Sequence, residues 1–234
     1  MVYHGSQRPD RVSRLLREMN CELHWVNPTE GEALPEDIDN WQGAVVFGGV
    51  HSVNDDRADI HAEQSWIKRW VGAQKPYLGL CLGGQFLAKA LGAPVRKLSD
   101  RSLEMGYVRI DPMEDNPWIT RPMYVFEWHN EGFTLPENCT WLARGQRCPV
   151  QAFSHRPWII GLQFHPEVVP HVAVEWYQEA GEQQHVYAAQ NLERQLRDAE
   201  TFEPYLEQWT TGLLQQWLEA GQQVTSENRE IAHG

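Results

Sequence analysis

The sequence predicts an α/β fold, and three patterns along the chain lead to this expectation. Short apolar runs alternate with amphipathic stretches over the first 90 residues, as parallel strands and crossover helices do. Short strand-like runs separated by Pro and Gly turns follow between residues 107 and 162. Stretches rich in Gln, Glu and Leu with helical spacing then occupy residues 182–221, which predicts a helical C-terminal extension.

The first 90 residues supply the expected parallel part of the sheet. Its strands are expected over residues 2–4, 21–26, 44–47 and 77–80. Its helices are marked by apolar stripes, which are Val12, Leu15, Leu16 and Met19, then Ile60, Trp66, Ile67, Trp70 and Val71, then residues 82–91. We therefore expect a flavodoxin-like, mostly parallel sheet flanked by helices, with a site at the carboxyl ends of its strands.

The middle of the chain changes character. Residues 107–110, 123–128, 140–143 and 150–153 are expected to be short strands between turns, and an apolar run over 158–162 is expected to be a further strand. Short turns join strands that run antiparallel. We expect the first four of these strands to extend or flank the parallel part of the sheet and to place loops near the site.

A domain of residues 1–180 is expected to be followed by a helical extension over residues 181–234. One helical stretch contains Tyr187 and Leu196, the second runs from Tyr205 to Leu218, and Pro204 separates them. The favoured interpretation is a helical hairpin packed on the domain. The alternative is an arm that docks a partner or a second copy of the chain.

The pentapeptide Gly79-Leu80-Cys81-Leu82-Gly83 joins an expected strand to an expected helix. A residue at so sharp a turn has a strained backbone, and glycines two positions before and after it leave room for the close crossing. A thiol at a helix N-terminus faces unpaired N–H groups and the positive end of the helix dipole, which favour the nucleophilic thiolate. By itself the pentapeptide fits a buried structural cysteine beside a tight turn equally well. The choice between a structural and a nucleophilic cysteine therefore depends on whether a base for the thiol is found elsewhere in the sequence.

The segment Gln163-Phe164-His165-Pro166-Glu167 contains the partners that such a thiol requires. His165 is expected at the end of the strand over 158–162, where Pro166 stops the pairing and turns the chain. Glu167 can fold back to accept a hydrogen bond from the imidazole. A base with an orienting carboxylate is the arrangement that activates a thiol. This segment and the Gly79–Gly83 turn together therefore predict an enzyme with a cysteine nucleophile.

Composition argues against several classes of function. The net charge of −12 disfavours binding to a nucleic-acid backbone. No apolar run is long enough for a transmembrane helix, and the first residues lack the pattern of a signal peptide. Four cysteines (Cys21, Cys81, Cys139 and Cys148) are too few for a disulfide scaffold and lack zinc spacing, and a required free thiol fits the reducing cytoplasm. We expect no metal and no organic cofactor.

These segments resemble a known family. Residues 79–85, Gly48-Gly49 with Ser52, and residues 163–167 together are similar to a class I glutamine amidotransferase domain, above all to the glutaminase domain of GMP synthase and its stand-alone relatives. The similarity covers residues 2–180 in matching order. It implies Cys81 as the nucleophile, His165 as the base and Glu167 as the acid that orients the base.

The resemblance also implies an oxyanion hole and a substrate pocket. Gly49 and Leu82 would supply backbone N–H groups to the oxyanion hole, while Gln85 and Gly48 would shape the glutamine pocket. The roles of Gly49 and Leu82 agree with the expected reaction, because attack of a thiol on a carboxamide creates an oxyanion that needs preorganised hydrogen-bond donors.

Further positions match the family less closely. His129 and Glu131 resemble its loop of a histidine, any residue and an acid, although an aspartate is usual where Glu131 stands. His129 could contact substrate or cap a strand. Val50 stands where the family usually has proline, and Leu82 stands where GMP synthases commonly have tyrosine. No ATP-pyrophosphatase domain and no G-x-x-x-x-G-K-[ST] loop are present, so we expect the chain to cleave an amide without using the ammonia itself.

Three functions remain open at this point. In the first, a glutaminase releases ammonia from glutamine through a γ-glutamyl thioester on Cys81 and delivers it to a separate synthetase subunit. In the second, an independent γ-glutamyl hydrolase or peptidase acts on γ-glutamyl amines or peptides. The third is a non-catalytic regulatory module, which the intact set of Cys81, His165 and Glu167 argues against. Assembly into a homo-oligomer is left open.

Overall fold

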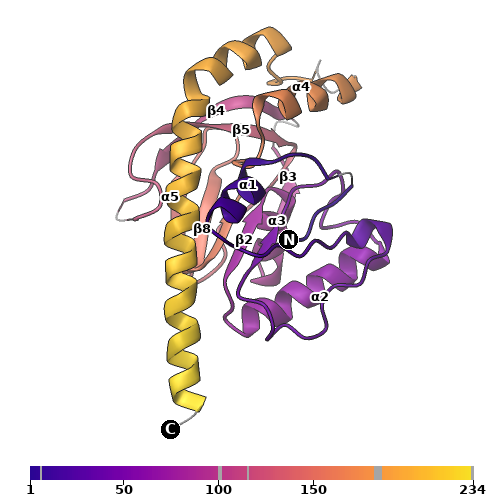
Figure 1. Ribbon diagram of the computed structural model, residues 1–234. Helices are drawn as coiled ribbons and strands as arrows, with labels where there is room; N and C mark the ends of the chain where they lie inside the picture. Colours follow the sequence, from indigo (N-terminus) through magenta and orange to yellow (C-terminus); the bar gives the residue numbers. More distant parts are fainter. Residues whose placement is uncertain (6, 100–101, 115, 182–185, 233–234) are drawn as a thin grey trace.

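The computed structural model describes residues 1–5, 7–99, 102–114, 116–181 and 186–232. A seven-stranded sheet has the order β1-β2-β9-β8-β7-β4-β5, and β3 pairs with β6 in a small second sheet (Figure 1). The strands are β1 (Ala44–Val46), β2 (Tyr77–Leu80), β3 (Val95–Lys97), β4 (Glu104–Pro112), β5 (Met123–His129), β6 (Glu131–Phe133), β7 (Thr140–Arg144), β8 (Val150–Arg156) and β9 (Ile159–Leu162). The helices are α1 (Arg11–Glu18), η1 (Pro28–Glu30), α2 (Ala58–Gly72), α3 (Leu82–Ala90), α4 (Pro170–Glu179) and α5 (Leu192–Ala232).

The α/β prediction is confirmed, but the parallel part of the sheet is smaller than expected. Strands β1, β2 and β9 pair in parallel, whereas the other four pairings of the seven-stranded sheet are antiparallel. Val2 adds single parallel bridges to Val26 and Val46. The expected strand over residues 21–26 is wrong, because its backbone hydrogen bonds with Met1 and Tyr3 are too few to form a ladder.

The parallel strands are buried on both faces. Val45, Leu78 and Ile160 lie in one apolar cluster, whereas their sequence neighbours Val46 and Tyr77 lie in another. This alternation is the period of two that a pleated strand imposes. Helices α2 and α3 cover the second cluster, and α1 and α5 cover the first. The core therefore fixes the strand ends from both sides.

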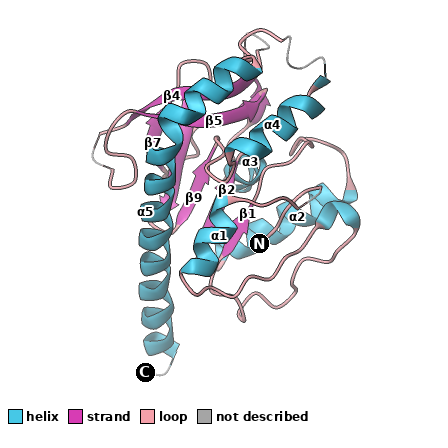
Figure 2. Ribbon diagram, turned by 45° about the horizontal axis from the view of Figure 1, so that its top comes forward, coloured by secondary structure: helices cyan, strands magenta, loops and turns pink. Residues whose placement is uncertain are grey.

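The added strands are antiparallel, as predicted, and longer than expected. Strand β4 pairs with β5 along seven residue pairs, from Glu104 opposite His129 to Ile110 opposite Met123. Helix α4 and the first part of α5 lie over β4 and β5 (Figure 2), where Val172 and Phe202 pack in one cluster with Phe126. Helix α4 and strands β3 and β6 were not predicted from the sequence.

The predicted helical hairpin at the C-terminus is wrong. Helix α5 is continuous from Leu192 to Ala232 with Pro204 inside it, and Figure 1 shows that it changes direction near its start. Proline removes one backbone hydrogen bond and bends a helix, but apolar packing on both sides of it can maintain the helix. Residues 182–185 and 233–234 of the expected extension lie outside the described residues.

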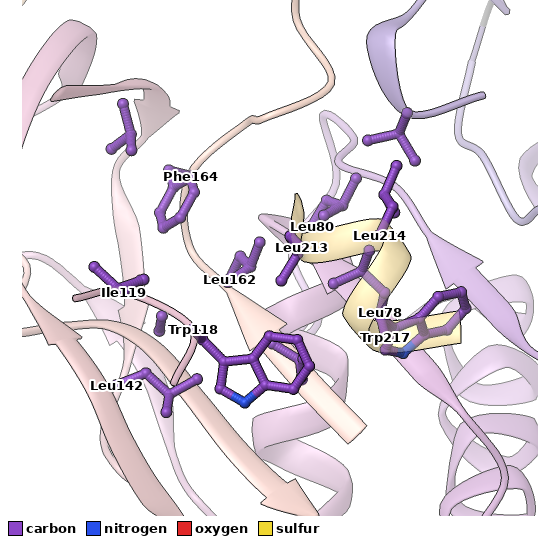
Figure 3. Close-up of a cluster of buried hydrophobic side chains, with 14 of the residues drawn as sticks. Leu78, Leu80, Trp118, Ile119, Leu142, Leu162, Phe164, Leu213, Leu214 and Trp217 are labelled. Atoms are coloured by element: carbon purple, nitrogen blue, oxygen red, sulfur yellow. The ribbon is translucent and has the colours of Figure 1, made fainter. Parts of the chain in front are cut away.

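Helix α5 is part of the main core. Leu213, Leu214 and Trp217 lie against Leu78 and Leu162 of the sheet (Figure 3). The indole N–H of Trp217 also donates to the carbonyl of Trp158 at 3.0 Å. Among the described residues, none of the helices combines the length and the hydropathy of a membrane span.

We expect Leu214→Ala to lower the free energy of unfolding by about 2–5 kcal/mol, because it deletes a fully buried side chain between α5 and the sheet. Its neighbour Gln215 is exposed on the same helix. Gln215→Ala should therefore change that free energy by less than about 0.5 kcal/mol. Denaturant unfolding of both variants checks the prediction, and equal stability of the two would contradict it.

Candidate active site

Cys81 lies at a strained turn between β2 and α3. Its backbone has φ 48° and ψ −102°, a region that side chains with a Cβ rarely adopt. The N–H of Cys81 donates to the carbonyl of Leu162 on β9 at 2.9 Å, which ties the turn to the sheet. Gln85 is the first residue of α3 to bond back, to the carbonyl of Cys81 at 2.9 Å. The N–H of Leu82 is therefore not used by the helix.

The glycines around Cys81 are required by close backbone crossings. A Cβ added at Gly79 would lie 2.4 Å from the carbonyl oxygen of Gly83. A Cβ added at Gly83 would lie 2.1 Å from the carbonyl oxygen of Val46 on β1. Both distances are too short for any side chain, so α3 can cross the strands this closely only with glycine at these positions.

His165 and Glu167 form a buried pair in the loop after β9. The Nδ1 of His165 lies 2.7 Å from a carboxylate oxygen of Glu167. The backbone N–H of His165 donates to the carbonyl of Phe126 at 2.8 Å, and its ring packs edge-on against Trp176. The two side chains are 4 % and 6 % exposed. Position and orientation of the imidazole are thus fixed by backbone, carboxylate and aromatic contacts.

The free nitrogen of His165 is on the side of Cys81. Nε2 of His165 has no hydrogen-bond partner among the described residues. Burial alone would lower the pKa of His165, but Cys81 and the Glu167 carboxylate outweigh it and raise this pKa well above its ordinary value. Gln163 donates from Nε2 to the sulfur of Cys81 at 3.7 Å, a contact that the sequence analysis did not anticipate. The arrangement can move a proton between thiol and imidazole.

Gly48, Gly49 and Leu82 surround the thiol. A Cβ added at Gly48 would lie 2.6 Å from Cε1 of His165 and 3.5 Å from Cβ of Cys81. A Cβ added at Gly49 would lie 3.0 Å from a methyl carbon of Leu82. The two segments expected to supply oxyanion donors therefore meet beside the thiol.

The remaining predicted residues converge on one backbone carbonyl. Nε2 of Gln85 donates to the carbonyl of Glu131 at 3.0 Å, and Nδ1 of His129 lies 2.9 Å from the same oxygen. The carboxylate of Glu131 accepts a hydrogen bond from the hydroxyl of Ser52 at 2.6 Å. A cavity of about 520 Å³ collects all nine predicted site residues, which are Gly48, Gly49, Cys81, Leu82, Gln85, His129, Glu131, His165 and Glu167.

At the wall of this cavity, His129 is held between two buried carboxylates. Its Nε2 lies 3.2 Å from Glu104 and 3.1 Å from Glu127. Burial would lower the pKa of His129, but the two carboxylates raise it to about 10. Burial also raises the pKa of Glu127. Nδ1 of His129 lies against the carbonyl of Glu131 and its Nε2 faces the two carboxylates, so the ring supports the Glu131 loop.

The same three side chains are the group of described residues whose geometry would suit a metal ion. Their ligand atoms lie within 4.8 Å of one another, and all three residues are buried. A metal ion could bind His129 only by displacing its proton, whose positive charge already balances one carboxylate. We therefore interpret the group as an ion-paired cluster. Glu127 was missed by the sequence analysis, although a carboxylate in an apolar strand signals a buried partner.

Arg11 anchors the loop that carries His165. Its backbone N–H donates to the carbonyl of Glu167 at 2.8 Å, and its guanidinium donates to the carbonyl of Pro166 at 2.6 Å. The same guanidinium bonds to Glu207 at 2.7 Å and to Glu203, both on α5. Arg11 is 1 % exposed. One buried cation thus connects α1, the loop after β9 and the C-terminal helix.

We expect His129 to stay protonated through the neutral range. Its NMR ring signals should not titrate between pH 5 and 9, with His129→Gln identifying them. Between pH 6.5, the ordinary pKa of histidine, and a pH of about 10, His129 keeps its proton in the folded chain and loses it in the unfolded chain. This contribution to stability is therefore complete below 6.5 and is lost as the pH rises through 10. A titration midpoint near 6.5 would contradict the prediction.

Comparisons with known proteins agree on one family. The family model for class-I glutamine amidotransferases matches residues 1–179. The chain is 33 % identical over 178 residues to a glutamine amidotransferase-like protein, YfeJ, of Salmonella typhimurium, covering 71 % of this chain and 74 % of that protein. It is 31 % identical over 174 residues to a subunit of the glutamine-hydrolysing GMP synthase of Thermoplasma acidophilum, covering 72 % and 82 %.

A solved structure extends the likeness to nearly the whole chain. The crystal structure of a glutamine amidotransferase from Methylobacillus flagellatus superposes with a TM-score of 0.87 at 26 % identity, covering 94 % of each chain. The similarity of fold therefore continues past residue 179 into the C-terminal part. With the family model matching most of its length, the chain belongs to the class I glutamine amidotransferase family.

Proposed function

We propose that this chain hydrolyses the γ-amide of glutamine and releases ammonia through a γ-glutamyl thioester on Cys81. The observation that carries the proposal is the strained Cys81 turn beside His165, whose other ring nitrogen is held 2.7 Å from Glu167. This is the arrangement of nucleophile, base and orienting carboxylate that thiol-dependent acyl transfer needs.

Acylation begins with the sulfur of Cys81. Its proton passes to Nε2 of His165, and the sulfur attacks the γ-carbonyl carbon, so that an S–C bond forms while the carbonyl π bond opens to an oxyanion. The N–H groups of Gly49 and Leu82 stabilise that oxyanion. The oxyanion then collapses, the C–N bond breaks, and His165 gives its proton to the leaving nitrogen. The products are ammonia and the thioester.

Deacylation reverses the roles. Water replaces ammonia beside His165. The imidazole takes one proton from the water while the water oxygen attacks the thioester carbon. The tetrahedral intermediate formed in this step breaks its C–S bond and expels the sulfur of Cys81, which takes the proton back from His165. Glutamate leaves and Cys81 is restored, so no oxidant, reductant or cofactor is consumed. Glu167 keeps the imidazole in the orientation and tautomer that both steps use.

In this proposal residues 1–180 hold every reacting group, and residues 181–234 add the C-terminal extension. The similarity to one subunit of a glutamine-hydrolysing GMP synthase supports delivery of the ammonia to a separate synthetase chain. Reliance on a reduced thiol suits the cytoplasm.

We expect Cys81→Ala to lower glutamate release from glutamine by ~10⁴-fold or more, and His165→Ala to have a comparable effect. Because the two side chains act as a unit, the double variant should be no slower than the worse single variant. Cys139→Ala is the matched control, since Cys139 is a free cysteine outside the cavity. Retention of activity in Cys81→Ala would refute the proposal.

The cavity supports a second candidate, hydrolysis of larger γ-glutamyl compounds. Its volume of about 520 Å³ is in the range of pockets that hold drug-sized ligands, and it continues from the thiol to Arg8, Trp176 and Glu179. A substituent on the γ-nitrogen would have room there. In that case the leaving group is an amine or a peptide, and the steps at Cys81 are unchanged.

A panel of γ-glutamyl substrates separates the two candidates. We expect glutamine to be the preferred substrate if the chain is a glutaminase, with slow turnover in isolation if a synthetase partner completes the site. Turnover of a γ-glutamyl amine or peptide at ~10-fold or more above glutamine in kcat/KM, abolished by Cys81→Ala, would select the independent hydrolase. Glutamate release measured by a coupled assay gives both comparisons.

A further inference from the structure

A third buried histidine side chain lies behind the loop that faces Cys81. His4 follows the short segment in which Val2 bridges to Val46, so it lies beside the Gly48-Gly49 turn after β1. Its Nε2 lies 2.9 and 3.1 Å from the two carboxylate oxygens of Glu63 on α2. Its Nδ1 lies 3.1 Å from the carbonyl oxygen of Gly48. The side chains of His4 and Glu63 are both 1 % exposed.

The partners of His4 determine its protonation. A carboxylate and a backbone carbonyl both accept hydrogen bonds, and an imidazolium, which donates from both ring nitrogens, is the form that satisfies both partners. Burial alone would lower the pKa of His4, but Glu63 and the carbonyl of Gly48 raise it above its ordinary value. A buried, doubly bonded cation of this kind holds one orientation, because leaving it would strand the carboxylate of Glu63 without its partner.

The bond from His4 also fixes the direction of the next N–H. The described part of the chain contains no cis peptide bond, and in a trans peptide the C=O and N–H groups point to opposite sides. The carbonyl of Gly48 points to His4, so the N–H of Gly49 points away from His4. A Cβ at Gly48 would contact Cys81 and His165, whereas a Cβ at Gly49 would lie 2.7 Å from Cβ of His4. The Gly48–Gly49 peptide therefore lies between His4 and the reacting groups.

We infer that His4 is a positioning residue for the proposed amide hydrolysis: held by Glu63, it fixes the Gly48–Gly49 peptide so that the N–H of Gly49 faces the oxyanion formed at Cys81. This inference rests on the proposed function and names the device that orients one oxyanion donor. His4 belongs to the lining of the cavity, but its side chain is 1 % exposed and bonds to Glu63 and Gly48, so its effect passes through the backbone of Gly48.

The variants are chosen to separate the two bonds of His4. His4→Leu removes both. His4→Asn keeps an amide N–H that can reach the carbonyl of Gly48 and loses the bond to Glu63. Glu63→Gln keeps an acceptor for Nε2 and removes the charge. His61→Leu is the matched control, because His61 is exposed on α2, the helix that carries Glu63. Thermal unfolding verifies that each variant is folded before its kinetics are compared.

Three measurements report different parts of the site. The first is kcat and KM for glutamine. The second is the affinity for the γ-aldehyde analogue of glutamine, to which the thiol of Cys81 adds to form a hemithioacetal whose oxygen occupies the oxyanion position. The third is the rate at which iodoacetamide alkylates Cys81. That reaction displaces iodide at a saturated carbon and forms no oxyanion, so it reports the thiol and its base without the donors.

For His4→Leu we expect kcat to fall ~10- to 100-fold, with KM within about 2-fold of the parent value. The aldehyde affinity should fall by a similar factor, and the alkylation rate should stay within about 2-fold. His4→Asn should lose less kcat and aldehyde affinity than His4→Leu. Glu63→Gln should have values of both quantities between those of His4→Asn and those of the parent chain. His61→Leu should match the parent in all three measurements.

Two results would overturn the inference. One is an unchanged kcat and aldehyde affinity in folded His4→Leu. The other is an alkylation rate that falls together with kcat, because the whole site would then be disturbed. If the parent chain releases no glutamate from any substrate, the proposed function fails, but the ratio of aldehyde affinity to alkylation rate still tests His4. A parent thiol that is alkylated yet binds no aldehyde would refute the inference, because there would be no oxyanion site to orient.

Discussion

The close crossing of α3 over the parallel strands is the constraint on which the site depends. Without a Cβ at Gly83, the first turn of α3 can lie against the carbonyl of Val46, and Cys81 is held at a positive φ between strand and helix. Strain of this kind persists only where the surroundings over-determine the backbone. Here the surroundings are the bond from Cys81 to Leu162 and the apolar layers on both faces of β2. The fold thus maintains a strained backbone at the thiol.

Three buried histidines around this turn show how partners decide chemistry. His4 has an oxygen acceptor at each ring nitrogen, and His129 has a carbonyl oxygen 2.9 Å from Nδ1 and two carboxylates within 3.2 Å of Nε2, which hold both rings in place. His165 has a carboxylate at one nitrogen and no hydrogen-bond partner at the other among the described residues. A ring that is bonded at both sides can only hold its neighbours in place. His165 is the ring whose second nitrogen is on the side of the thiol, which is the reason for proposing it as the base.

The sequence predicted those parts whose signal is local. The elbow around Cys81 and the strand over Tyr77–Leu80 follow from glycine spacing and a short apolar run, and the structure has both. The path of α5 could not be predicted in this way, because Pro204 is locally a helix breaker and only packing against the sheet keeps the helix continuous. The contact of His4 with Glu63 joins residues 59 positions apart. A hint was available in Glu63 itself, which shares the buried stripe of α2 with Ile60 and Ile67.

The buried guanidinium of Arg11 has a consequence for the order in which this molecule is made. Synthesis releases α1 long before it releases Glu203 and Glu207, whose carboxylates balance that charge. Until then the cation lacks both carboxylates and the apolar face later covered by α5 is uncovered, and incomplete domains with such surfaces are prone to associate. The loop of His165 and Glu167 is bonded to the same residue. The contacts that hold this loop to α1 and α5 are therefore complete only after α5 has been synthesised, so the surroundings of His165 and Glu167 are assembled late.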